Sequence, residues 1–335
     1  MFPFKYTKAT TVPDAAKRVA NNTKAKYLAG GTNLIDLMKE DVEQPDELVD
    51  INNIKVAAIT KIGPGTNGSG ASIGALAKNT ETANHPLIRK NFPVLTQAIL
   101  AGASVQIRNM ATNGGNLNQR TRCPYFYDIT MVCNKRLPGS GCSALKGVNK
   151  LHAIFGWSNE CVAVHPSDMC VALAALDAVV KVQGKKAERS IPFNDYHRLP
   201  GTTPAKDNNL SPDELITSIE IPANNFSDKY YYLKVRDRSS YAFALVSVAV
   251  ALETAGTQIK QARIALGGVA HKPWRAFAAE NFLVGKTASE SNFREAASIA
   301  LSDAKPLEHN LYKIELTNKA IVRALLQAMK GGMHS

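Results

Sequence analysis

The sequence lacks any run of eighteen uninterrupted apolar residues, which is about the length a helix needs to cross a bilayer. Its first six residues, Met1 to Tyr6, also lack the apolar stretch of a secretory signal. We therefore expect no membrane span and no signal peptide in this chain. The cytoplasm and the bacterial periplasm both stay open, because a chain without its own signal can be exported while bound to a signal-bearing subunit.

Groupings of residues that make or break bonds on organic substrates are also missing. The seven histidines are spread along the chain, and we find no Ser–His–Asp set, no paired carboxylates and no H-x-x-x-H helix. We therefore expect no catalytic residues for substrate chemistry in this chain.

Positive charge is plentiful but is not concentrated in one place. The formal net charge is +12, yet the densest basic groups, at 181–189 and 234–238, are interrupted by acidic or apolar residues. No basic stripe is interleaved with aromatic side chains, as nucleic-acid binding would favour. The distribution argues against a nucleic-acid partner and favours a basic surface that faces an acidic partner subunit.

The apolar content of 45% over 335 residues indicates a folded protein of two or three subdomains. Short strands alternate with helices up to residue 222, which predicts an α+β fold. A polar, turn-rich segment at 223–229 predicts a boundary, after which we expect a second sheet followed by helices from Ala276 onward. The early strands are expected at 2–6, 26–29, 47–51, 56–60 and 71–75, and the late strands at 230–236, 245–252 and 261–266.

Two short glycine-bearing loops, Ala29 to Asn33 and Thr112 to Asn116, lie about eighty residues apart. The first connects the expected strand at 26–29 to an expected helix at 34–39, and the N-terminal end of a helix attracts anions. Each loop offers free backbone N–H groups, small residues and a hydroxyl or amide side chain, which suit a pyrophosphate. Together they predict a dinucleotide site.

A third glycine-rich segment, Gly63 to Gly68, matches the dinucleotide pattern G-x-G-x-x-G literally. That pattern requires a helix directly after the loop. Here the segment contains Pro64 and leads into an expected strand, so we interpret it as a hairpin turn.

Cysteine is scarce, and its odd count of five argues against a disulfide scaffold. One irregular segment contains four of the cysteines: it begins at Cys123, ends at Cys161 and includes Cys133 and Cys142. A bound metal would keep such a long irregular segment ordered. Their spacing matches neither a zinc finger nor a ferredoxin, and four thiolates suit zinc and a [4Fe–4S] cluster equally. The neighbouring dinucleotide site favours the redox-active cluster.

Cys170 lies in an apolar helix expected at 169–180 and capped by Ser167, so we interpret it as a core thiol.

Four segments together resemble the FAD-binding subunit of molybdenum hydroxylases, the xanthine dehydrogenase family. They are Ala29 to Leu34, Ala111 to Leu117, His165 to Asp168 and Ala265 to Ala270. The resemblance runs from end to end. Within it, the segments Cys123 to Asp128 and Cys133 to Cys142 resemble the periplasmic aldehyde oxidoreductases, whose FAD subunit carries an extra [4Fe–4S] cluster. Most relatives have FAD and no such cluster.

The resemblance implies a PCMH-type (vanillyl-alcohol-oxidase-like) FAD-binding domain at 1–224, with subdomains at about 1–55 and 56–224. It further implies an iron–sulfur insertion at 121–162 and a C-terminal domain of the CO dehydrogenase flavoprotein type at 225–335. The FAD positions that it implies are Lys26, Tyr27, Leu28, Ala29, Gly30, Gly31, Thr32, Asn33, Leu34, Ala111, Thr112, Gly115, Asn116, Asp168, Leu210 and Lys234, and the cluster ligands are Cys123, Cys133, Cys142 and Cys161.

Three of these positions carry specific expectations. Lys234 matches a lysine near the flavin ring, where positive charge favours the reduced anionic form. Asp168 either touches FAD or serves as a helix cap, and Tyr27 either flanks a ring system or packs ordinarily.

The resemblance implies that this chain is one subunit of a heterotrimer. A molybdenum-cofactor subunit hydroxylates an aldehyde, a [2Fe–2S] subunit passes on the electrons, and FAD in this chain delivers them to an external acceptor. Two other interpretations of the residues stay open. One is a binding protein stabilised by a zinc ion on four cysteines, and the other is a self-sufficient flavin oxidase.

Overall fold

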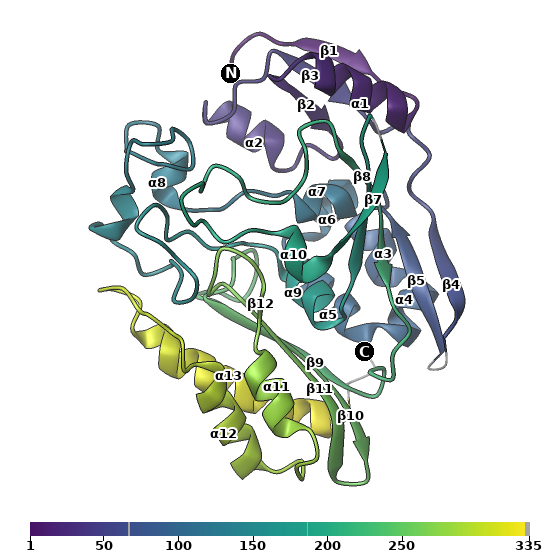
Figure 1. Ribbon diagram of the computed structural model, residues 1–335, viewed down its shortest axis with the longest axis vertical. Coiled ribbons are helices and arrows are strands. Elements are labelled where there is room, and N and C mark those ends of the chain that lie inside the picture. Colours follow the sequence, from purple (N-terminus) through teal and green to yellow (C-terminus); the bar gives the residue numbers. More distant parts are fainter. Residues whose placement is uncertain (66–67, 186, 332–335) are drawn as a thin grey trace.

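The computed structural model describes residues 1–65, 68–185 and 187–331. Three sheets follow one another along the long axis of the molecule, with the N-terminal sheet at one end and the C-terminal helices at the other (Figure 1). The mixed helix-and-sheet architecture expected from the sequence is confirmed. Among the described helices, none is both long and apolar enough to span a membrane.

The N-terminal sheet has three parallel strands in the order β1-β3-β2. Their bounds are β1 Lys5–Lys8, β2 Ala25–Leu28 and β3 Glu47–Asp50. Helix α1 (Val12–Asn21) follows β1 and buries its apolar face, and α2 (Leu34–Lys39) follows β2. The strand expected at 2–6 begins later, at Lys5, because Phe2 and Phe4 are exposed and pair with no described strand.

The middle sheet has five antiparallel strands in the order β4-β5-β8-β6-β7. Their bounds are β4 Ile59–Gly65, β5 Gly68–Gly74, β6 Val179–Gln183, β7 Glu188–Pro192 and β8 Leu215–Ile221. The helices of this part are α3 Asn79–Asn84, α4 Pro86–Asn91, α5 Pro93–Ala101, α6 Val105–Met110, α7 Asn113–Leu117, α9 Asp168–Ala175 and α10 Phe193–Tyr196. The strand expected at 56–60 is therefore shifted toward the C-terminus.

The segment that matches G-x-G-x-x-G connects β4 to β5, which pair antiparallel. A strand therefore follows the segment where a Rossmann loop would need a helix, as the hairpin interpretation requires. Residues 66 and 67 of this motif lie outside the described residues.

The helix expected at 169–180 is too long. Helix α9 ends at Ala175, Asp177 adopts a left-handed backbone with φ 51°, and the chain enters β6 at Val179. The carboxylate of Asp177 pairs with Arg263 and Arg275, which holds this turn. The continuous apolar run hid the change from helix to strand, because periodicity cannot separate the two in a fully buried segment.

The C-terminal sheet is antiparallel in the order β12-β11-β10-β9, and three helices cover one of its faces (Figure 1). The bounds are β9 Lys229–Val235, β10 Val246–Ala255, β11 Gln258–Gly267, β12 Trp274–Arg275, α11 Phe277–Leu283, α12 Glu290–Ala300 and α13 Tyr312–Met329. In β10, Val248 and Val250 pack toward these helices, whereas Ala249 and Ala251 join the core around α9. This alternation is the two-residue period of a strand buried on both faces.

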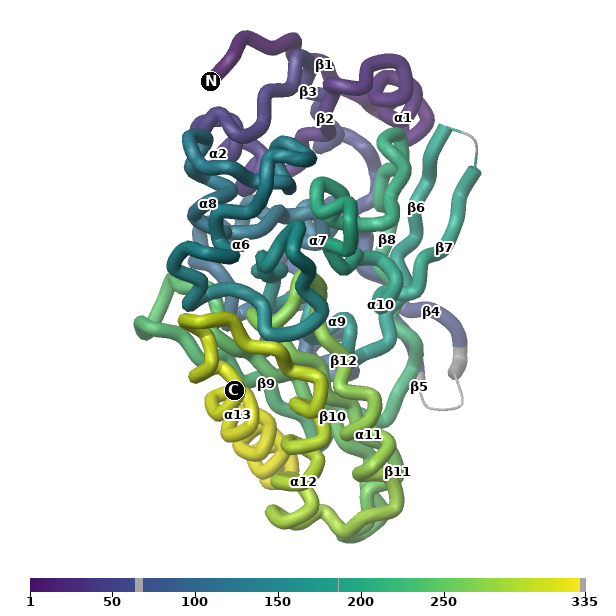
Figure 2. Tube along the Cα trace, turned by 60° about the vertical axis from the view of Figure 1, so that its left-hand side comes forward, coloured from purple at the N-terminus to yellow at the C-terminus, as the bar shows by residue number. Residues whose placement is uncertain are grey.

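The segment between α7 and α9 contains little regular structure beyond α8 (Pro124–Tyr127) and a 3-10 turn at Ser143–Leu145. It lies between α2 and the chain that leads into α13 (Figure 2). Phe126 and Cys133 pack on Leu37 of α2 at one side, and Asn310 donates to main-chain carbonyls of 152–153 at the other. The irregular segment is thus held by both ends of the chain.

Candidate cofactor site

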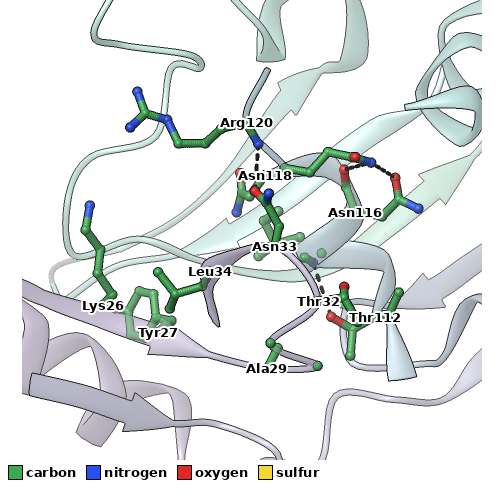
Figure 3. Close-up of a pocket in the computed structure, with 18 of the residues that line it drawn as sticks. Lys26, Tyr27, Ala29, Thr32, Asn33, Leu34, Thr112, Asn116, Asn118 and Arg120 are labelled. Atoms are coloured by element: carbon green, nitrogen blue, oxygen red, sulfur yellow. Dashed lines mark hydrogen bonds between the residues drawn. The ribbon is translucent and has the colours of Figure 1, made fainter. Parts of the chain in front are cut away.

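A cavity of about 560 Å³ lies between the two glycine loops. This volume falls within the range of about 300–1,000 Å³ that ligand sites usually have. Of the sixteen residues expected at the FAD site, thirteen line it (Figure 3). They are Lys26, Tyr27, Ala29, Gly30, Gly31, Thr32, Asn33, Leu34, Ala111, Thr112, Gly115, Asn116 and Leu210.

Gly30 of the first loop lies directly against the chain that leads into the second loop. A Cβ atom at this position would lie 2.1 Å from the carbonyl oxygen of Met110, so only glycine allows the approach. Gly31 next to it has a left-handed backbone with φ 73°, which turns the chain from β2 toward α2. The first loop is therefore shaped by its two glycines for different reasons.

The second loop is fixed by its own side chains and by buried amides. The Thr112 hydroxyl caps α7 by accepting from the Gly115 N–H at 3.2 Å. The Asn116 side chain donates to Asn79 at 2.7 Å and accepts from the Ser167 hydroxyl at 2.6 Å. Such a connected network fixes the loop before any ligand arrives.

Two buried donors at this cavity have no acceptor among the described residues: Asn33 Nδ2 and Arg122 Nε. Both residues line the cavity, and the other side-chain polar atom of Asn33, Oδ1, accepts from the main-chain N–H of Arg120 at 2.9 Å (Figure 3). Buried donors nearly always find a partner. Oxygen atoms of an anionic ligand would supply one here, so the donor set fits a pyrophosphate.

The remaining three expected residues are placed differently. Leu28 ends β2 and does not line the cavity. Asp168 lines a second cavity of about 220 Å³, which adjoins the first because both contain Arg122 and Phe243. Lys234 lines neither, because its Nζ forms a buried ion pair with Asp168 Oδ2 at 2.7 Å.

Asp168 is held by a second buried group as well. The Tyr232 hydroxyl donates to Asp168 Oδ1 at 2.7 Å, and burial raises the pKa of that phenol well above its ordinary value. Ser167, not Asp168, caps α9, because its hydroxyl accepts from the Cys170 N–H at 3.1 Å. The capping role expected of Ser167 is confirmed.

Tyr27, in the strand before the first loop, lines the cavity and also forms a hydrogen bond outside it. The Tyr27 hydroxyl donates to the main-chain carbonyl of Asp213 at 2.8 Å, and burial raises the pKa of Tyr27 well above its ordinary value. Tyr27 thereby ties β2 to the turn that precedes β8.

The four cysteines at 123, 133, 142 and 161 line one small cavity. Cys133 and Cys142 lie opposite each other on an antiparallel bridge, and the Asn134 N–H donates to the Gly141 carbonyl at 2.7 Å. Burial raises the pKa of Cys123 to about 12 and that of Cys161 to about 11, and neighbouring thiols of the same set add to both shifts. Such groups are held neutral unless a cation neutralises them.

Main-chain N–H groups point at these sulfur atoms. Those of Tyr125 and Phe126 donate to Cys123, and those of Ala144 and Val162 donate to Cys142. Hydrogen bonds to sulfur stabilise the thiolate form that metals require. The donor set therefore fits a thiolate-bound metal centre.

The fifth cysteine lies apart from this set. Cys170 is fully buried in α9 among the apolar residues of the middle core, as the sequence predicts. Among the described residues, the ligand atoms of Cys170, His165 and His197 form the one group of three or more within 4.8 Å of one another. The other four thiols are therefore spread more widely than that.

Comparison with known proteins identifies the family. The model described as the FAD-binding domain in molybdopterin dehydrogenase matches residues 2–224, and that of the CO dehydrogenase flavoprotein C-terminal domain matches residues 231–328. The chain belongs to this family of FAD-binding subunits. The mixed fold with an FAD-binding domain and a flavoprotein C-terminal domain, expected from the resemblance, is thereby confirmed, and so is the family itself.

Individual relatives of this FAD-binding subunit cover nearly the whole chain. It is 46% identical over 331 residues to the aldehyde oxidoreductase FAD-binding subunit PaoB of Escherichia coli, covering 98% of this chain and 99% of that protein. It is 29% identical to the glyceraldehyde dehydrogenase medium chain of Sulfolobus acidocaldarius, covering 91% and 90%. A chain of the carbon monoxide dehydrogenase structure from Hydrogenophaga pseudoflava matches with a TM-score of 0.76 and 25% identity, covering 98% of this chain and 99% of that one.

Sequence reasoning missed one residue of the FAD-binding subunit at this site, Arg120, which lines the first cavity. Its guanidinium pairs with Glu43 at 2.6 Å and with Asp207 at 2.8 Å, and it lies 4.7 Å above the Phe126 ring. Burial would raise the pKa of the Asp207 carboxyl, but Lys135 and Arg120 hold it well below its ordinary range. Arg120 therefore joins the cavity to the cysteine segment. Glu43 and Asp207 are distant in sequence, so no local motif signals the contact.

Proposed function

We propose that this chain is the FAD- and [4Fe–4S]-binding electron-transfer subunit of a heterotrimeric, molybdenum-dependent aldehyde oxidoreductase. One observation carries the proposal: the cavity between the glycine loops and the four-cysteine cavity occur together and are linked by Arg120. The relative in Escherichia coli, named as the FAD-binding subunit of an aldehyde oxidoreductase, supports the substrate class.

The residues of this chain would hold FAD as follows. The backbone at Gly30 and Gly31 and the capped loop at Thr112 fix a narrow passage for the pyrophosphate. Lys26 and Arg122 bring positive charge to its wall, and the unpartnered Arg122 Nε supplies a donor. When bound, FAD accepts electrons and releases them to an external acceptor.

Cys123, Cys133, Cys142 and Cys161 would bind the [4Fe–4S] cluster. A single tetrahedral zinc ion with bonds of about 2.3 Å to sulfur draws four thiolates closely together. Since the four sulfur atoms do not form a group within 4.8 Å of one another, their spread favours the larger cluster over zinc.

Two partner subunits complete the proposal, one with the molybdenum cofactor and one with a [2Fe–2S] cluster. The net charge of +12 suits contact with acidic partner surfaces. We propose that the assembled trimer is exported to the periplasm with a signal-bearing partner, since the cysteine segments resemble those of periplasmic enzymes. Recovery of the trimer from the cytoplasmic fraction alone would contradict the export.

The test is a pair of cysteine variants in the chain co-expressed with its partner subunits. We expect Cys133→Ser to lose most of its iron–sulfur content beyond that of the [2Fe–2S] subunit while keeping FAD, because Cys133 lies away from the flavin cavity. The matched control, Cys170→Ala, changes a core thiol and should keep both. Unchanged iron in Cys133→Ser overturns the ligand assignment, and zinc in place of iron favours the zinc-stabilised alternative.

A separate measurement distinguishes the subunit from a self-sufficient oxidase. The purified chain alone should carry FAD but turn over no aldehyde, because the proposal places the hydroxylation of the substrate in the molybdenum-cofactor subunit. Aldehyde turnover by the chain alone would contradict the proposal.

A further inference from the structure

His152 lies directly against one of the four cysteines. Its Nε2 atom is 3.2 Å from the sulfur of Cys123, and the side chain is 2% exposed. Among the described hydrogen-bonded contacts of these four sulfur atoms, this is the one made by a side chain rather than by main-chain N–H groups.

The imidazole has a single N–H to place. In a neutral ring this N–H sits on either Nδ1 or Nε2. The other ring nitrogen, Nδ1, is buried without an acceptor among the described residues. A hydrogen on Nε2 points at the Cys123 sulfur, which can accept it. A hydrogen on Nδ1 would have no acceptor among the described residues. The Nε2–H tautomer is therefore favoured.

The position of His152 is set by the C-terminal domain and not by the cysteine segment alone. Lys313 Nζ donates to the His152 carbonyl oxygen at 3.0 Å and to the Gly268 carbonyl at 2.7 Å. Asn310 Nδ2 donates to the same His152 carbonyl at 3.1 Å. Both donors are fully buried, so the backbone that carries the imidazole is fixed from outside the cysteine segment.

We propose that His152 is a positioning residue that donates its Nε2–H to the Cys123 thiolate and thereby raises the reduction potential of the cluster. The inference rests on the proposed cluster. A hydrogen bond to a ligand sulfur stabilises the reduced, more negative cluster more than the oxidised one, so it favours electron uptake. The protein then uses the contact between its C-terminal domain and the cysteine segment to tune an electron carrier.

The test compares two substitutions in the assembled complex. His152→Leu removes the donor and keeps an apolar side chain of similar bulk, whereas His152→Gln keeps an N–H that can reach sulfur. His309→Leu is the matched control, because the His309 side chain is exposed and only its main-chain N–H contacts Asn149. The measurement is a potentiometric titration of the reduced cluster followed by electron paramagnetic resonance, together with iron content.

We expect His152→Leu to lower the ratio of reduced to oxidised cluster about tenfold at a fixed ambient potential, a shift of about 59 mV for one electron. His152→Gln should recover most of the shift, and His309→Leu should leave the potential unchanged.

An unchanged potential in His152→Leu at full iron content overturns the inference. Absence of a four-iron signal in the unsubstituted complex instead overturns the proposed cluster, so the two failures are distinguishable. If His152→Leu loses its iron, its potential cannot be measured and the test passes to His152→Gln. A cluster potential in His152→Gln that is about 59 mV or more below that of the unsubstituted complex then overturns the inference.

Discussion

Asp168 and Lys234 form a buried ion pair between α9 and β9, with 2.7 Å between Oδ2 and Nζ and side-chain exposures of 7% and 4%. The sequence places both residues beside FAD by resemblance, yet each is engaged by the other. Their contact joins the middle of the molecule to the C-terminal sheet at the wall of the second cavity.

The first prediction concerns this pair. Asp168→Asn should destabilise the protein by about 3–5 kcal/mol, because it leaves the Lys234 charge buried without its partner. Chemical unfolding monitored by circular dichroism measures the loss. The control is Lys319→Met, which breaks the exposed Glu315–Lys319 pair and should change stability by less than about 0.5 kcal/mol. If both substitutions lowered the free energy of unfolding by the same amount, burial of the Asp168–Lys234 pair would not explain its contribution to stability.

The second prediction concerns the contact between the glycine loops. Gly30→Ala should remove most of the bound FAD, because its Cβ would push the Met110 carbonyl and separate the two loops. Gly256→Ala is the control, since that glycine has a left-handed backbone at φ 59° with open space around it. The control should cost about 1–2 kcal/mol of stability through backbone strain and leave FAD bound. The flavin-to-protein absorbance ratio measures both, and full flavin in Gly30→Ala would show that the loops tolerate separation.

The third prediction concerns pH. Burial lowers the pKa of His197 to about 4, whereas an unfolded chain has a histidine pKa of about 6.5. Between these values the unfolded state binds a proton that the folded state does not. The free energy of unfolding should therefore be highest above about pH 6.5 and fall as the pH drops toward 4.

Substitution isolates this contribution. His197→Gln should reduce the pH dependence of stability by about 1.4 kcal/mol per pH unit between pH 5 and 6, because one titrating group is removed. The amide of glutamine retains a donor for the Leu117 carbonyl, to which His197 Nε2 bonds at 2.9 Å. Urea unfolding at several pH values gives the slope. An unaltered slope would mean that His197 titrates alike in both states.

The sequence predicts the glycine loops well because their signal is local. Gly30 and Gly31 follow a strand and precede a helix, and that order alone predicts where backbone N–H groups are exposed. The network around Arg120 carries no such signal. Its partners Glu43 and Asp207 lie 77 and 87 residues away, so only the folded chain brings them together.

The missed end of α9 has a different cause. Residues 169–180 are almost entirely apolar, and α9 is buried on every side. A helix without a polar face has no periodicity to mark its end. The left-handed turn at Asp177, which directs the chain into β6, depends on arginines from β11 and β12. A local pattern cannot contain that information.

The burial of α9 also decides how the molecule can be divided. Its apolar core extends without interruption from the middle sheet to Ala249, Ala251 and Ala265 on one face of the C-terminal sheet. A chain cut near residue 228 would leave this face and the helices opposite it in water. The two regions matched by separate family models therefore share one buried core, and we expect neither to stay folded alone unless another surface covers this face.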